Sequence, residues 1–162
     1  MTRRRIVRDA ERAAAGAALV AVLLSWPASA MSQRTTIRTG TISVPDGFAV
    51  HERRGTDSYP GMIVRADSAL VVEYDIGAMA GARVHPSRRG EYAWLVEHEV
   101  AGHRAYTGLS SKHGRSRIST TILGDGTDPW TLPANFSADV RDERDVTQFT
   151  LIVASYRPGR RR

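Results

Sequence analysis

The chain has 162 residues, with 23 Lys and Arg, 17 Asp and Glu, and no cysteine. Hydrophobic residues make up 41% of it and charged residues 25%, a composition typical of a folded protein rather than a disordered one. The length suits a single domain. Without cysteine the chain has no disulfides, thiolate metal ligands or cysteine nucleophiles.

Residues 1–30 have the organisation of an export signal peptide. Five arginines lie among the first 12 residues, and an uncharged apolar stretch follows over residues 13–26. That stretch of about 14 residues is shorter than the roughly 20 that span a bilayer as a helix. Pro27 and the small residues Ala28, Ser29 and Ala30 then predict a cleavage site. We expect a periplasmic or secreted protein that is not an integral membrane protein after signal cleavage.

The segment from Thr2 to Arg8 also resembles the twin-arginine export signal. It has a threonine, two arginines, a position open to any residue (here Arg5), two apolar residues and a final arginine, in that order. The acidic residues Asp9 and Glu11 depart from the usual basic character of that region. The resemblance implies the twin-arginine export route.

The basic excess of the chain lies at its two ends. Residues 1–30 hold five Arg and two acidic residues, which leaves 18 basic and 15 acidic residues in the remainder. Residues 160–162 form a basic tail of three arginines, so residues 31–159 carry 15 charges of each sign. A nucleic-acid-binding domain carries its basic excess on the folded body, and we therefore expect no nucleic-acid partner.

Short strands are predicted early in the mature chain, after a polar and flexible stretch over residues 31–36. Residues 41–44 are rich in β-branched residues, and turn residues at 45–47 separate them from a second short strand that begins at Phe48. Residues 62–65 and 70–76 read as a hairpin. Leu70, Val72, Tyr74 and Ile76 share one face of it by period-two alternation.

The middle of the chain predicts a long loop over residues 77–90 and then a strand over residues 93–100. Trp94, Val96, His98 and Val100 alternate with Leu95, Glu97 and Glu99, which places the two groups on opposite faces of this strand. Residues 103–107 are expected to return as a strand after a turn at Ala101 and Gly102.

The last third of the chain gives a weaker signal. We expect a polar turn over residues 110–115, a strand over residues 118–123 and a loop over residues 124–137. Residues 143–156 carry apolar residues at helical spacing after an acidic start, although many of them are β-branched and favour a strand. The helix is the preferred interpretation.

These elements predict an α+β fold. We expect a single domain over residues 31–159, with five to seven short strands in an antiparallel sheet that is covered on one face by a C-terminal helix and loops. The order of a strand ending at Val44, a Pro45-Asp46-Gly47 turn, a central hairpin and a closing segment from Phe149 to Tyr156 resembles small bacterial exported domains of the PsbP/Mog1-like kind. The resemblance implies a binding or assembly role rather than catalysis.

The histidines offer one candidate metal site. His98 and His103 flank Glu99 but are five residues apart, whereas the zincin motif needs a spacing of four on a helix. A bent strand could still bring them together, with His113 or His85 as a third ligand and Glu99 as the catalytic residue. The competing interpretation is that His98 lies at the edge of the core and Glu99 is solvated.

Two carboxylate pairs lie at alternate positions of predicted strands, Glu73 with Asp75 and Glu97 with Glu99. The ~6.6 Å between such positions is comparable to the spacing of glycosidase carboxylates. If the two strands paired, all four side chains could share one face. A solvated sheet face balanced by arginines is the preferred interpretation.

Aromatic residues indicate a binding groove. Tyrosine and tryptophan are frequent at binding hot spots, and we expect a groove formed by Trp94, Trp130 and the loop at 77–90, with Tyr92 and Tyr106 nearby.

The sequence thus favours an exported, non-catalytic binding or assembly module of the bacterial cell envelope, with an unknown envelope or extracellular protein as partner and no cofactor. One alternative is a small metal-dependent hydrolase centred on His98, Glu99 and His103. Another is a secreted inhibitor or effector that acts through an exposed strand edge.

Overall fold

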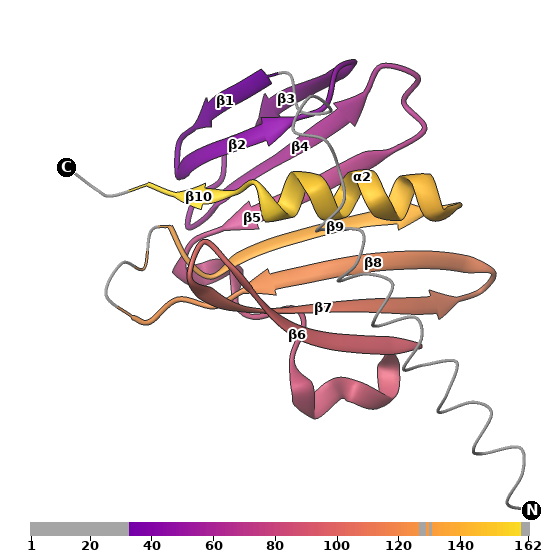
Figure 1. Ribbon diagram of the computed structural model, residues 1–162. Coiled ribbons are helices and arrows are strands. Elements are labelled where there is room, and N and C mark those ends of the chain that lie inside the picture. The colour runs from indigo at the N-terminus through magenta and orange to yellow at the C-terminus, as the bar shows by residue number, and fades with distance from the viewer. Residues whose placement is uncertain (1–32, 127–128, 130, 160–162) are drawn as a thin grey trace, which may run out of the picture.

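The computed structural model describes residues 33–126, 129 and 131–159, which form two antiparallel sheets and one α-helix, α2, near the C-terminus (Figure 1). The larger sheet contains, in spatial order, β3 (Phe48–Glu52), β4 (Tyr59–Arg65), β5 (Val71–Ile76), β9 (Ala134–Val140), β8 (Arg115–Ile122), β7 (His103–Lys112) and β6 (Trp94–Val100). The smaller sheet has the order β1 (Gln33–Ile37), β2 (Gly40–Val44) and β10 (Arg157–Pro158). The predicted export signal and the basic tail lie outside the described residues, so the structure does not bear on either.

Strand β5 shows how sequence alternation becomes a buried face. Val72, Tyr74 and Ile76 are at most 4% exposed, while Glu73 between them faces solvent. The period-two pattern predicted for this strand is confirmed. The β4–β5 ladder pairs Ile63 with Val72, which continues the same buried face across the sheet.

Helix α2 (Glu143–Ala154) confirms the helical interpretation of the last element. Asp142 caps its N-terminus, because the side chain accepts a hydrogen bond from the backbone N–H of Asp145. Phe149, Ile152 and Val153 are buried on one side of the helix. Burial of this stripe outweighs the weak helix propensity of its β-branched residues.

Helix α2 contacts β9 of the large sheet and β2 of the small one (Figure 1). The buried hydrophobic residues form one cluster, which includes Ile42 of β2, Phe136 of β9 and Ile152 of α2. Within this cluster the ring centre of Phe136 lies 6.2 Å from that of Tyr74 and 5.5 Å from that of Tyr156.

Several elements differ from the sequence-based expectation. The described residues form ten strands rather than five to seven. Strand β9 occupies part of the predicted loop at 124–137, because Ala134 and Ala138 on its buried face are too small to give a strong hydrophobic signal. Strand β7 continues through the predicted polar turn to Lys112, and β1 occupies a stretch that was expected to be flexible.

Candidate functional site

Strand β6 lies at the end of the large sheet and pairs with β7 along its whole length. The two strands are joined by Ala101 and Gly102, which both have positive φ, 54° and 81°. Such a two-residue turn is the type I′ turn that suits β-hairpins, and it makes the flanking residues Val100 and His103 a hydrogen-bonded pair.

The turn also fixes which backbone groups of β6 face β7. Hydrogen-bonded pairs alternate along an antiparallel ladder. Counting from Val100, the N–H and C=O groups of Trp94, Val96, His98 and Val100 point toward β7. Those of Leu95, Glu97 and Glu99 point away from the sheet. No strand among the described residues pairs with this outer side of β6.

A pocket of about 390 Å³ lies at the start of β6, between the strand and the 3₁₀ segment η3 (Pro86–Glu91). Its lining consists of Arg89, Gly90, Tyr92, Ala93, Trp94, Leu95 and Val96. Arg89 Nη1 lies 3.5 Å from the carbonyl oxygen of Leu95, one of the outward-pointing groups. The pocket therefore opens on the outer edge of the strand.

The segment between β5 and β6 is held on the face of the sheet opposite α2. Val84 is fully buried there, and its N–H donates to Thr121 Oγ1 at 2.9 Å. The ring of Tyr92 lies over Gly108 of β7, where a Cβ atom would come within 2.5 Å of it. Burial raises the pKa of the Tyr92 hydroxyl, which donates to the carbonyl of Arg83. These contacts position the pocket wall against the sheet.

The structure places two of the four predicted groove residues at the pocket. Tyr92 and Trp94 both line the pocket. Tyr106 is only 6% exposed and lies on the sheet face opposite Trp94, with the guanidinium of Arg104 5.9 Å from its ring centre. Trp130 lies outside the described residues. Arg89 was not singled out from the sequence, and its only signal there was its place in an arginine pair just before a predicted strand.

The histidines considered as metal ligands are only partly brought together. His98 and His103 fall on the same sheet face in neighbouring strands, but Glu99 points to the opposite face. His113 follows the far end of β7, ~30 Å from His103 at the usual rise per residue. Within the described residues, no three His, Asp or Glu side chains are grouped so that they could hold a metal ion.

His98 takes part in a polar row across three strands instead. Its Nε2 lies 2.7 Å from Thr107 Oγ1, which lies 2.7 Å from Thr120 Oγ1. Burial lowers the pKa of His98 below its ordinary value of 6.5, which favours the neutral ring.

The carboxylate pairs lie apart from each other, because β9, β8 and β7 separate β5 from β6. Glu73 and Asp139 both form ion pairs with Arg117, at 2.6 and 2.9 Å. Asp75 pairs with Arg83 at 2.9 Å. The β5 carboxylates thus belong to a polar face balanced by arginines. Glu97 and Glu99 are exposed and form no ion pair with any described residue.

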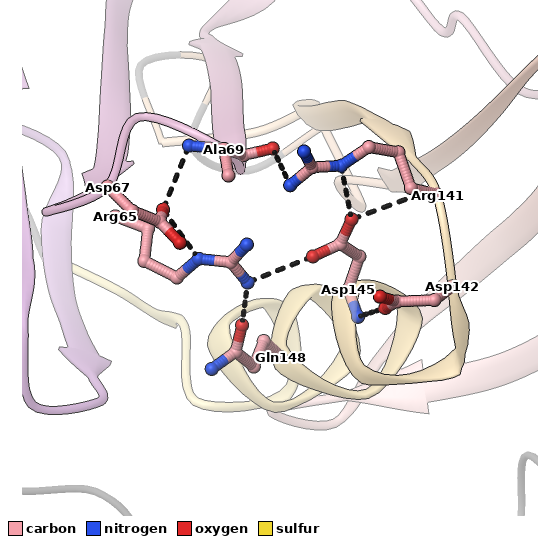
Figure 2. Close-up of polar contacts among 7 residues, drawn as sticks. All are labelled: Arg65, Asp67, Ala69, Arg141, Asp142, Asp145 and Gln148. Carbon is pink, nitrogen blue, oxygen red and sulfur yellow. Dashed lines mark hydrogen bonds and ion pairs between the residues drawn. The ribbon is translucent and has the colours of Figure 1, made fainter.

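A second charged cluster joins the start of α2 to the β4–β5 turn (Figure 2). Asp145 is 1% exposed and accepts hydrogen bonds from Arg65 Nη1 at 2.9 Å and from the backbone N–H of Arg141 at 3.1 Å. Arg65 also donates to Asp67 and Gln148, and Arg141 to the carbonyl of Ala69.

The charge of Asp145 is well compensated. Burial alone would raise the pKa of its carboxyl, but hydrogen bonds from Arg141 and Arg65 outweigh that effect and hold the pKa below its usual range. Figure 2 shows the Asp145 carboxylate between the guanidinium groups of Arg65 and Arg141, with a contact to each. This arrangement indicates a structural role.

The chain matches no protein-family model, no curated protein and no solved structure. The resemblance to PsbP/Mog1-like domains therefore stays a prediction. Among the residues that the structure describes, no helix has the length and hydropathy needed to cross a bilayer.

Proposed function

We propose that this protein is an exported, non-catalytic binding or assembly module of the cell envelope, and that it binds a protein partner through the outer edge of β6. In this proposal residues 31–159 act as a single domain, with α2 covering one face of the large sheet. The export signal predicted over residues 1–30 supports the location, and the balanced charge of residues 31–159 argues against a nucleic-acid partner.

The observation that carries this proposal is the outward-pointing backbone of Leu95, Glu97 and Glu99. Three N–H and three C=O groups without a strand partner form a template on which an extended segment adds as a further strand. The pocket beside Trp94 gives such a segment a place for a side chain. A catalytic role has no comparable support, because Glu99 points away from the face that carries His98 and His103.

Site-specific crosslinking in the exporting host tests the proposal. A photoreactive residue at position 95 should give a discrete protein adduct, and one at exposed Arg34 on β1 should not. The substitution Glu97→Pro removes an outward N–H without removing a bond to β7, so it should abolish the adduct from position 95. An adduct that persists in Glu97→Pro, or that forms equally from position 34, would contradict the proposal.

A further inference from the structure

The side chains of the outward-pointing residues of β6 define what kind of segment fits there. Leu95, Glu97 and Glu99 lie on one face of the strand, and Trp94, Val96 and His98 on the other. Both glutamates are exposed and lack an ion pair among the described residues. An added strand places its own side chains directly opposite these positions.

A second copy of β6 is a poor occupant. Antiparallel pairing of two copies over the whole strand sets Glu97 opposite Glu97 and Leu95 opposite Glu99. Like charges placed directly opposite each other destabilise a strand pair. Basic residues at two alternate positions of a different segment instead complement Glu97 and Glu99.

The start of β6 indicates which end of the partner arrives there. All strand pairs of the large sheet are antiparallel. A segment that continues this pattern brings its C-terminal end to the N-terminal end of β6, where the pocket lies. Arg89 lines that pocket, and its guanidinium forms no ion pair with a described residue. A guanidinium forms strong, often bidentate hydrogen bonds with a carboxylate, and a terminal carboxylate is the group that the end of a chain brings to this place.

We propose that β6 binds the C-terminal end of a partner protein as an added antiparallel strand, with the terminal carboxylate at Arg89 and two basic residues opposite Glu97 and Glu99. This inference rests on the proposed function and names the chemistry of the partner. If the last residue lies opposite Trp94, the basic residues are the third and the fifth before it. The last residue itself is apolar, and its side chain lies on the same sheet face as Trp94, which lines the pocket.

A designed hexapeptide tests this chemistry directly. The probe is N-acetyl-Lys-Thr-Lys-Val-Thr-Val with a free carboxyl terminus, and its affinity for the purified full-length chain is measured by titration calorimetry. Amidation of the probe and the substitution Arg89→Gln should each weaken binding by about tenfold, the effect of losing one charge-assisted hydrogen bond. The double substitution Glu97→Gln and Glu99→Gln should weaken it by about fivefold.

A charge exchange supplies the matched control. The double variant Glu97→Lys and Glu99→Lys should lose affinity for the probe and gain affinity for a peptide with Glu in place of both Lys. The proposal would be overturned if this variant still bound the Lys-containing probe more tightly than the Glu-containing peptide. It would also be overturned if the free and amidated probes bound equally well. Absence of any binding of the probe to the unaltered protein at millimolar concentration would also overturn it.

The Glu97→Pro variant separates this proposal from the one on which it rests. If Glu97→Pro abolishes binding but neither the charge exchange nor amidation has an effect, strand addition stands and the partner chemistry is wrong. If the probe binds Glu97→Pro as well as it binds the unaltered chain, strand addition at β6 is itself wrong. A thermal unfolding curve for each variant shows whether it is folded.

Discussion

Charged residues are buried and paired in one region of the molecule, the start of α2, and exposed without an ion pair to a described residue in another, the edge strand β6. At the start of α2, Asp145 is buried between Arg65 and Arg141, and each charged group has its partner within the cluster (Figure 2). On the edge strand β6, Glu97 and Glu99 are exposed, and their backbone groups point away from the sheet. A closed network of this kind contributes to folding, whereas an open edge is available for a partner. The predictions below separate these two roles.

The largest effect is expected from breaking the closed network. Asp145→Ala leaves Arg65 partly buried with one partner fewer, which should lower the free energy of unfolding by about 3 kcal/mol. Urea denaturation measures this change. Asp67→Ala, at an exposed position of the same cluster, should cost well under half as much. Equal losses of stability in the two variants would show that the buried Arg65–Asp145 pair contributes no more than the exposed Arg65–Asp67 pair.

Proline substitutions in β6 test which backbone groups face outward. Val96→Pro removes a hydrogen bond to β7 and should lower the stability by about 3 kcal/mol. Glu97→Pro removes only an outward N–H and should have a much smaller effect on the thermal midpoint. The opposite order would mean that the direction assigned to these groups from the turn at Ala101 and Gly102 is wrong.

Gly108 lies under the ring of Tyr92, so a substitution there should change both the stability of the protein and the shape of the pocket. In Gly108→Ala the new Cβ would lie 2.5 Å from the Tyr92 ring, so the ring must move and the pocket must change shape. We expect a loss of about 1–2 kcal/mol in stability from this overpacking, together with weaker binding of the probe peptide. Combined with Tyr92→Ala, the same substitution should have little further effect on stability, which a double-mutant cycle measures.

The closed network should also respond to acid. Because the pKa of Asp145 is lower in the folded state than its ordinary value of 3.8, the stability it supplies is present above that value and is lost as the pH falls through the folded pKa. Urea midpoints at pH 7 and pH 3 should therefore differ less in Asp145→Asn than in the unaltered protein. If the urea midpoint fell by the same amount in both proteins, ionisation of Asp145 would not be a source of the loss of stability in acid.

The smallest effect concerns His98. Its folded pKa is lowered by burial, so below pH 6.5 the unfolded chain takes up a proton that the folded state does not. Stability should decline as the pH falls from 7 toward 5, and His98→Gln should flatten that decline.

Much of the fold was predictable from local patterns. The alternation of Val72, Tyr74 and Ile76 indicated a half-buried strand, and the acidic start at Asp142 favoured a helix over a strand. Strand β9 was missed because its buried face depends on alanines, whose burial is decided by α2 and not by their own hydrophobicity. Strand β1 forms a local hairpin with β2, whereas β10 pairs with β2 from the other end of the described chain and depends on that long-range contact.

The site was less predictable. Tyr92 and Trp94 were recognised as candidates from residue type alone, and both line the pocket. Arg89 was not, because only the folded chain places η3 beside the start of β6. The outward direction of Leu95, Glu97 and Glu99 depends on the β6–β7 register and on the type of turn. The turn residues Ala101 and Gly102 hinted at a hairpin, but the order of strands in the sheet did not follow from them.

Amide hydrogen exchange of β6, measured with and without the acetylated hexapeptide, tests the open edge most directly. In the free protein the amides of Leu95, Glu97 and Glu99 should exchange fast, and those of Val96 and His98 slowly. Saturating peptide should slow the first group and leave the second unchanged. Slow exchange at all five positions in the free protein, or no change at Glu97 when the peptide is bound, would contradict strand addition at β6.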